Sequence, residues 1–198
     1  MKYKILLNDE PYRMTSEDAP CLIIYRDKSG GSQLSISLIA EMFLRGEKIL
    51  FITAFPPGKE NFFEQTKGGE DKISYIETIE QLNRSARAIV LESGNEKLLL
   101  ECIEKLSDID ERTIFIKNIE TFSPEIFKKL LGRKNIILSG DIDRCADKGL
   151  ITKNEFTTII AFSQPETPFP IKVPDLQKYA AFFHGRDHDG ILRLVPED

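Results

Sequence analysis

The sequence has little of what disulfide-bonded, membrane-spanning or secreted proteins require. Its three cysteines, Cys21, Cys102 and Cys145, are odd in number and far apart, so they match neither a disulfide framework nor the paired C-x-x-C spacing of a zinc site. No window approaches the roughly 18 consecutive apolar residues of a membrane span, and MKYKILLNDEPYRM at the N-terminus is too polar for a signal peptide. We therefore expect a soluble, cytoplasmic protein with free thiols and no membrane partner.

Positive charge is also in short supply. The chain has 27 lysines and arginines against 32 aspartates and glutamates, a formal net charge of -5, with both signs interleaved. Because neutralising phosphates requires clustered cations, this balance argues against a broad nucleic-acid-binding face. The best basic run comprises Lys128, Lys129, Arg133 and Lys134, which is short and equally typical of a solvated helix end. A nucleic-acid partner is therefore unsupported by charge, although a local patch stays open.

What the sequence does have is an alternation of short apolar runs with helical patterns. This alternation predicts an α/β fold with a mostly parallel sheet. Several runs are apolar on consecutive residues, as expected of strands covered by helices on both faces, so we expect a three-layer arrangement. Strands are predicted at Leu22–Tyr25, Ile49–Thr53, Ala88–Leu91, Thr113–Ile116, Asn135–Leu138 and Thr157–Phe162.

The 198 residues, 41% of them apolar, suffice for one domain with a buried core. We predict a single domain with a core at 21–162, a proline-bearing linker at 163–175 and a C-terminal appendage at 176–198. Asp189-Gly190 predicts a type I′ turn, which would make the appendage a β-hairpin. Its histidines, His184 and His188, would lie about 13 Å apart along a strand, so a polar hairpin tip is favoured over a metal site.

The stretch CLIIYRDKSGGSQLSIS has the layout of a phosphate-binding loop between a strand and a helix. The helix carries an apolar stripe of Leu34, Leu38, Ile39 and Met42, and Gly46 is placed to end it. A working loop reads G-x-x-x-x-G-K-[ST], with backbone N–H groups around the phosphates and the lysine on their oxygens.

Neither alignment of this loop retains the lysine. With Gly31 as the last glycine, Ser32 replaces the lysine and Gln33 the hydroxyl residue; with Gly30, the lysine becomes Gly31 and Ser32 keeps the hydroxyl. Lys28 offers an unconventional replacement, whereas an ordinary turn with Ser32 capping the helix is the alternative. The candidate phosphate-binding residues here are Lys28, Ser29, Gly30, Gly31, Ser32 and Gln33.

A second candidate region is TIFIKNIETFSPEIFKKLLGRKNIILSGD, residues 113–141. In P-loop ATPases a strand here ends in an aspartate that orients magnesium, and the matching positions are Lys117 and Asn118. Glu120 is the nearby carboxylate that we consider as a catalytic base, with a solvated turn residue as the alternative. The next strand ends in Ser139-Gly140-Asp141, where a polar residue senses phosphate, so Asp141 joins the candidate site.

From Cys21 to Asp141, roughly three fifths of the chain, the order of these segments resembles the core of a RecA-like P-loop NTPase of the additional-strand class. The resemblance rests on the loop, RGEKILFITAF as the next strand, IFIKNIETF in the Walker B place and NIILSGD as the sensor strand. It implies that the phosphate-loop strand lies between the sensor strand and the strand after it, with the hairpin at one edge. The sequence departs from the family at the Walker A lysine and the Walker B aspartate.

These departures favour a non-catalytic domain, a pseudo-ATPase that acts as a binding or scaffold subunit. Its expected partner is another protein, either an active ATPase relative or a second copy of itself. One alternative is a nucleic-acid-associated accessory protein of RecA-like shape. The other is an unconventional ATP-binding NTPase that uses Lys28 or a neighbouring subunit's lysine with Ser32 and Glu120. We assign no cofactor, and weak binding of ATP, ADP or phosphate stays open.

Overall fold

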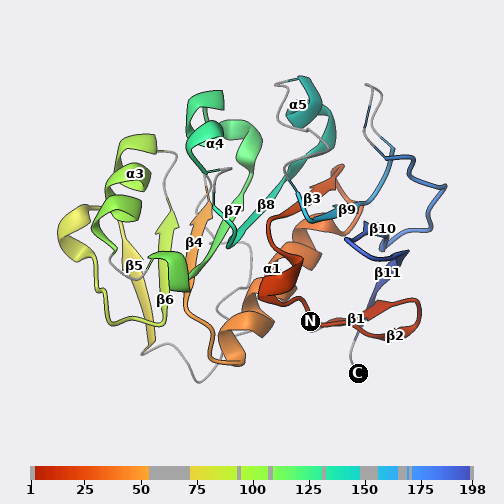
Figure 1. The fold of residues 1–198 in the computed structure, drawn as a ribbon, viewed down its shortest axis with the longest axis horizontal. Coiled ribbons are helices and arrows are strands. Elements are labelled where there is room, and N and C mark those ends of the chain that lie inside the picture. The colour runs from red at the N-terminus through yellow and green to blue at the C-terminus, as the bar shows by residue number, and fades with distance from the viewer. Residues whose placement is uncertain are drawn as a thin grey trace.

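The computed structural model of the chain describes residues 3–53, 72–92, 95–106, 109–130, 133–147, 156–164, 169 and 171–196. Its strands form one 11-stranded sheet in the order β2-β1-β11-β10-β9-β3-β8-β7-β4-β6-β5 (Figure 1). The strands are β1 Tyr3–Leu7, β2 Glu10–Pro11, β3 Cys21–Tyr25, β4 Ile49–Thr53, β5 Ile73–Ile76, β6 Ala88–Glu92, β7 Thr113–Lys117, β8 Ile136–Asp141, β9 Thr158–Ala161, β10 Ala180–His184 and β11 Asp189–Pro196. The helices are α1 Gly31–Leu44, α3 Glu96–Lys105, α4 Pro124–Leu130 and α5 Ile142–Asp147, with 3-10 turns η1 Ser16–Asp18, η3 Ile79–Gln81, η4 Ile109–Glu111 and η5 Ile119–Thr121.

The parallel part of the sheet has the strand order that the resemblance implied. β3 pairs in parallel with β8 on one side and with β9 on the other. β8 in turn separates β3 from β7, which makes β8 the additional strand. All the strands predicted from the sequence are present, as β3, β4, β6, β7, β8 and β9.

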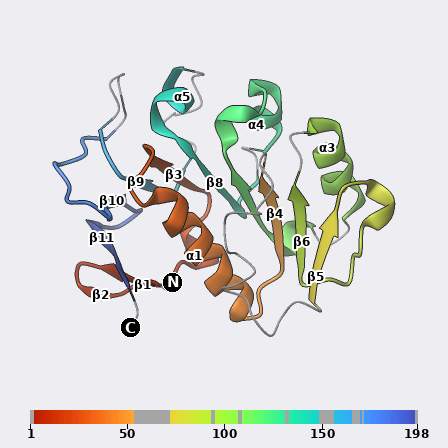
Figure 2. The same cartoon turned by 180° about the vertical axis from the view of Figure 1, so that it is seen from behind.

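Helices pack on both faces of this sheet and create two separate apolar clusters. Leu34, Leu38 and Phe43 of α1 pack on one face, which is seen in front in Figure 2. α3, α4 and α5 cover the other face, seen in front in Figure 1, with side chains such as Leu99, Ile126 and Ile142. Every residue of β3 and β4 is buried, as expected for strands between two helical layers.

Helix α1 ends as predicted but begins differently. Gly46 has a φ of 97°, and the N–H groups of Gly46 and Glu47 donate to the carbonyls of Phe43 and Met42 at 3.0 and 3.1 Å, a Schellman motif. At the other end Gly30, with a φ of 103°, is the N-cap residue and makes no side-chain capping bond. The alternative in which Ser32 is the N-cap residue does not hold, because Gly30 takes that position and Ser32 lies in the first helical turn.

The C-terminal strands pair as a hairpin, but its turn lies elsewhere. β10 and β11 are antiparallel with His184 opposite Asp189, so the turn comprises residues 185–188, closed by an N–H of Gly185 that donates to His188 at 3.0 Å. The predicted type I′ turn at Asp189-Gly190 is wrong. Gly190 lies inside β11, where a Cβ atom would be 2.8 Å from the side-chain amide of Asn8. This glycine therefore permits a close approach between β11 and the residue that follows β1.

The hairpin extends the parallel strands through β10 and β9, and β1 then adds to β11. Of the predicted linker, Pro165, Pro168 and Pro170 lie outside the described residues. Ile171 and Val173 of its described part are buried against the helix-covered face that contains α3 to α5. The N–H of Val173 donates to Oε1 of Gln164 at 2.7 Å, which joins the two ends of the segment.

All three cysteines are free and buried. Among the described residues, no three histidine, cysteine or acidic side chains gather closely enough to hold a metal ion. His184 instead lies 2.6 Å, from Nδ1 to Oδ1, from Asp189. No helix in the described ranges has the length and apolar character needed to cross a membrane.

Candidate functional site at the carboxyl edge of the sheet

Buried polar side chains gather where the parallel strands end. The register places Thr53 opposite Lys117, and Lys117 opposite Ser139, so the three residues form one row across β4, β7 and β8. Their exposed fractions are 2%, 2% and 0%. Because the carboxyl ends of parallel strands are where open α/β sheets bind ligands, this edge, the upper one in Figure 1, is the candidate site.

The loop between β3 and α1 keeps backbone features of an anion-binding turn. The N–H of Ser29 donates to the carbonyl of Arg26 at 3.2 Å, and Lys28 and Gly30 both have positive φ angles, of 65° and 103°. Since α1 begins at Gly31, Gly30 is the last residue of the loop. Of the two alignments, the structure favours the one in which Gly31 takes the lysine position and Ser32 the hydroxyl position.

In that alignment the first glycine of the motif corresponds to Tyr25, and this residue changes the loop. A Cβ atom built on Gly31 would lie 2.2 Å from both Cβ and Cγ of Tyr25. A Cβ atom on Gly30 would lie 2.7 Å from Cδ1 of Tyr179. Each loop glycine therefore packs directly against an aromatic side chain, one from β3 and one from the residue just before β10.

Arg26 links the loop to the segment after the sensor strand. Its Nε and one terminal nitrogen donate to the two carboxylate oxygens of Asp143 at 3.0 and 3.3 Å. Asp143 belongs to the first turn of α5, directly after β8. This bidentate pair therefore joins the carboxyl end of β3 to that of β8.

Lys117 stands at the end of β7, where the resemblance requires a magnesium-binding carboxylate. An ammonium group has three donors and no acceptor, whereas magnesium is bound by oxygen ligands. Asn118 follows in the left-handed conformation with a φ of 59° and starts η5. The residues present at this strand end therefore do not fit a magnesium ion.

Glu120, the predicted base, is buried at 7% exposure, so the alternative of a solvated turn residue is wrong. Its Oε2 accepts the backbone N–H of Asp141 at 3.2 Å. Burial raises the pKa of Glu120 above its usual value, and hydrogen bonds from the backbone and from Asn118 oppose that rise. The carboxylate lies against Gly140, where an added Cβ atom would be 2.3 Å from Oε2.

Two of the remaining predicted site residues, Asp141 and Gln33, make local hydrogen bonds. Oδ1 of Asp141 accepts the N–H of Arg144 at 3.0 Å, which caps the start of α5. Nε2 of Gln33 donates to the hydroxyl of Ser37 at 3.3 Å, along α1. Lys28 is exposed, and Ser139 Oγ is buried with no hydrogen-bond partner among the described residues.

The structure places Lys28, Ser29 and Gly30 in the loop after β3 and Gly31, Ser32 and Gln33 in the first turn of α1, and it places Glu120 beside Asp141 at the same edge of the sheet. Sequence reasoning missed Tyr25, Arg26, Asp143 and Tyr179. Tyr25 and Arg26 begin the stretch YRDKSGG, so the sequence did show a bulky ring and a cation at the start of the loop. Tyr179 and Asp143 gave none, because their proximity depends on the pairing of β10 with β9 and of β8 with β3.

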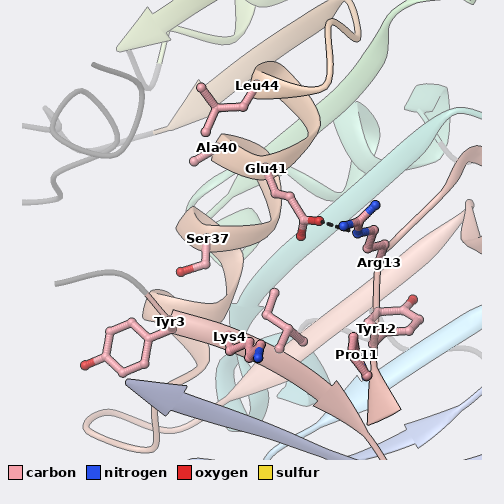
Figure 3. A pocket seen from close by; sticks show the side chains of 10 residues that line it. Tyr3, Lys4, Pro11, Tyr12, Arg13, Ser37, Ala40, Glu41 and Leu44 are labelled. Atoms are coloured by element: carbon pink, nitrogen blue, oxygen red, sulfur yellow. Dashed lines mark ion pairs between the residues drawn. The ribbon is translucent and has the colours of Figure 1, made fainter. Parts of the chain in front are cut away.

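A separate pocket of about 310 Å³ lies between α1 and the N-terminal strands (Figure 3). Arg13 and Glu41 form an ion pair of 3.6 Å across it. Its lining residues are Tyr3, Lys4, Ile5, Pro11, Tyr12, Arg13, Ser37, Ala40, Glu41 and Leu44. None of them belongs to the loop or to the carboxyl edge, so this pocket is distinct from the candidate site.

Comparison with solved structures shows which fold the chain has. The genome packaging NTPase B204 of Sulfolobus turreted icosahedral virus 2, in complex with sulfate, aligns with a TM-score of 0.59 and 14% identity over 93% of this chain and 99% of its own. ATPases 2 and 3 of EssC from Geobacillus thermodenitrificans align with a TM-score of 0.61 and 9% identity, covering 98% of this chain and 40% of theirs. The chain therefore has a RecA-like P-loop NTPase fold.

Sequence similarity is more limited. No known family model matches the chain. It is 28% identical over 116 residues to the probable inactive ATP-dependent zinc metalloprotease FTSHI 2, chloroplastic, of Arabidopsis thaliana. That alignment covers 56% of the chain, and the chain spans only 13% of the relative's length.

Proposed function

We propose that the chain is a single, three-layered RecA-like domain with a C-terminal hairpin, which does not hydrolyse nucleotide and serves as a cytoplasmic binding or scaffold subunit. Its partner would be another protein, either an active ATPase of the same fold or a second copy. The observation that carries this proposal is Lys117, buried at the end of β7 where magnesium needs a carboxylate.

The degenerate loop supports the same proposal. Phosphoryl transfer is accelerated mainly by cations placed on the phosphate oxygens, and Gly31 supplies none at the lysine position. The Arabidopsis relative, named a probable inactive ATP-dependent zinc metalloprotease, is in line with a chain of this kind that lacks activity. The B204 NTPase, in contrast, has been captured with sulfate and with AMP.

The nucleic-acid alternative finds less support in the structure. The basic run lies at the end of α4 and before β8, at the amino edge of the sheet and away from the candidate site. Arg133 of this run pairs with Asp110 at 2.7 Å, which neutralises part of the patch.

We expect no phosphate release from ATP above the buffer rate, with or without magnesium. The assay compares the wild-type chain with the Lys28→Ala variant, because Lys28 is the exposed cation of the loop. An active P-loop ATPase serves as the positive control. Magnesium-dependent release by the wild type that disappears in Lys28→Ala would overturn the proposal in favour of an unconventional NTPase.

A further inference from the structure

We infer that the phosphate loop is closed by the chain's own side chains, with Tyr25 occupying the space that a lysine side chain would need. This inference rests on the proposed non-catalytic function and explains how the loop is used instead. Its first observation is the distance of 2.2 Å between the Cβ position of residue 31 and both Cβ and Cγ of Tyr25. Real Cβ atoms do not come this close to other atoms, so only glycine fits at position 31.

Tyr25 has no room to move away from this position. Its Cβ atom is attached to the backbone of β3, which is hydrogen-bonded to β8 on one side and flanked by β9 on the other. Its side chain is 7% exposed and packs in the apolar cluster that contains α1. Tyr25 therefore excludes every side chain larger than that of glycine at position 31, and this exclusion includes the lysine of a working loop.

Tyr179 covers Gly30, the last residue of the loop. Its Cδ1 lies 2.7 Å from the Cβ position of Gly30, and its Cα lies 3.5 Å from it. Tyr179 has a φ of 63°, an uncommon conformation for an aromatic residue that persists only where surrounding contacts impose it. The N–H of Leu194 donates to its carbonyl at 3.1 Å, so β11 holds the residue in place.

The ion pair of Arg26 with Asp143 is the third contact that the loop makes with another part of the chain. Both guanidinium contacts, at 3.0 and 3.3 Å, go to a carboxylate of the same chain. An anion entering the loop would compete with Asp143 for the guanidinium of Arg26. The loop therefore serves as a packing surface, on which Tyr179 holds the start of β10 against the N-terminus of α1.

The test is a double-variant cycle with inorganic phosphate as the probe. Gly31→Lys, Tyr25→Gly and the double variant are compared with the wild type by urea unfolding and by amide chemical shifts of Gly30 and Ser32 during phosphate titration. Glycine is used at position 25 because it removes both Cβ and Cγ of Tyr25, the two atoms that lie 2.2 Å from the Cβ position of residue 31. We expect Gly31→Lys to be strongly destabilised in the wild type and to cost less stability in the Tyr25→Gly background, where the atoms that it meets are absent. Phosphate should shift the amide signals of Gly30 and Ser32 in the double variant, whereas the wild type should show no shift at the same phosphate concentrations.

A second pair of variants keeps the test informative if Gly31→Lys does not fold. Tyr179→Ala removes a ring that is 40% exposed, and Tyr75→Ala on β5, 42% exposed, is its matched control. The Tyr179 ring should shift the Gly30 proton signals in the wild type and in Tyr75→Ala, and this ring-current shift should vanish in Tyr179→Ala. Its absence from the wild type would overturn the inference.

Two results would separate this inference from the proposed function. Phosphate-dependent shifts at Gly30 and Ser32 in the wild type, without ATP hydrolysis, would show an open loop and overturn the inference alone. ATP hydrolysis by the wild type would overturn both. Gly31→Lys that unfolds at the same urea concentration as the wild type would also contradict the packing of Tyr25 on Gly31.

Discussion

Replacing Arg112 with methionine is expected to destabilise the fold by about 3 kcal/mol or more. Arg112 is 1% exposed and lies between η4 and β7. Its terminal nitrogens donate to the carbonyls of Ala86 and Arg87 at 3.1 and 3.3 Å and to that of Arg84 at 2.9 Å. Methionine fills similar space but has no donor, so these carbonyls would lose a charged hydrogen-bond partner in the interior.

Urea unfolding measures this effect, and Arg193→Met is the matched control. Arg193 is also paired, with Asp9 at 2.7 Å, but its side chain is 51% exposed. Exposed ion pairs contribute about 0–1 kcal/mol, so the control should unfold near the wild-type midpoint. Equal, small effects of the two substitutions would contradict the structural role assigned to Arg112.

Gly140→Ala is expected to destabilise the fold by about 3 kcal/mol through overpacking at the candidate site. The added Cβ atom would lie 2.3 Å from Oε2 of Glu120, 3.0 Å from Sγ of Cys145 and 3.0 Å from Cγ1 of Ile119. All three neighbours are buried, so none can move into solvent without leaving the core.

The partner substitution tests whether Glu120 causes this effect. In a Glu120→Ala background the carboxylate is absent, so Gly140→Ala should cost at least about 1 kcal/mol less than in the wild type. The free energies of unfolding of the two single variants and the double variant give this difference. Strict additivity would show that Glu120 does not pack against Gly140.

The central strands were predictable because burial on both faces makes them continuously apolar, as in Ile23-Ile24 and Ile136 to Leu138. β1, β2 and β5 were not predicted. β1 carries an exposed Lys4, β2 has only two residues, and β5 includes an exposed Tyr75, so none has a clear apolar pattern. These strands form through pairing with β11, β1 and β6, which are long-range contacts that no local pattern reports.

The candidate site was predictable in position but not in its contacts. Strand order placed the loop, Glu120 and Asp141 at one edge of the sheet, as the structure shows. Burial of Glu120 and of Lys117 depends on η5 and on the strands beside β7, whereas the sequence shows only charged residues at the end of an apolar run. The prediction of the hairpin turn was wrong because Asp-Gly is a strong local turn signal. In the structure Gly190 instead lies inside β11, in close contact with Asn8.

Thermal unfolding with magnesium and nucleotide tests whether the carboxyl edge of the sheet is unable to hold a magnesium nucleotide. A ligand that binds the native state at about 100 times its Kd adds about 2.7 kcal/mol to stability, which a melting curve resolves easily. We expect ATP and ADP up to the millimolar range to leave the wild-type Tm unchanged, with magnesium or with a chelator. A Tm that rises with nucleotide concentration only when magnesium is present would contradict this expectation.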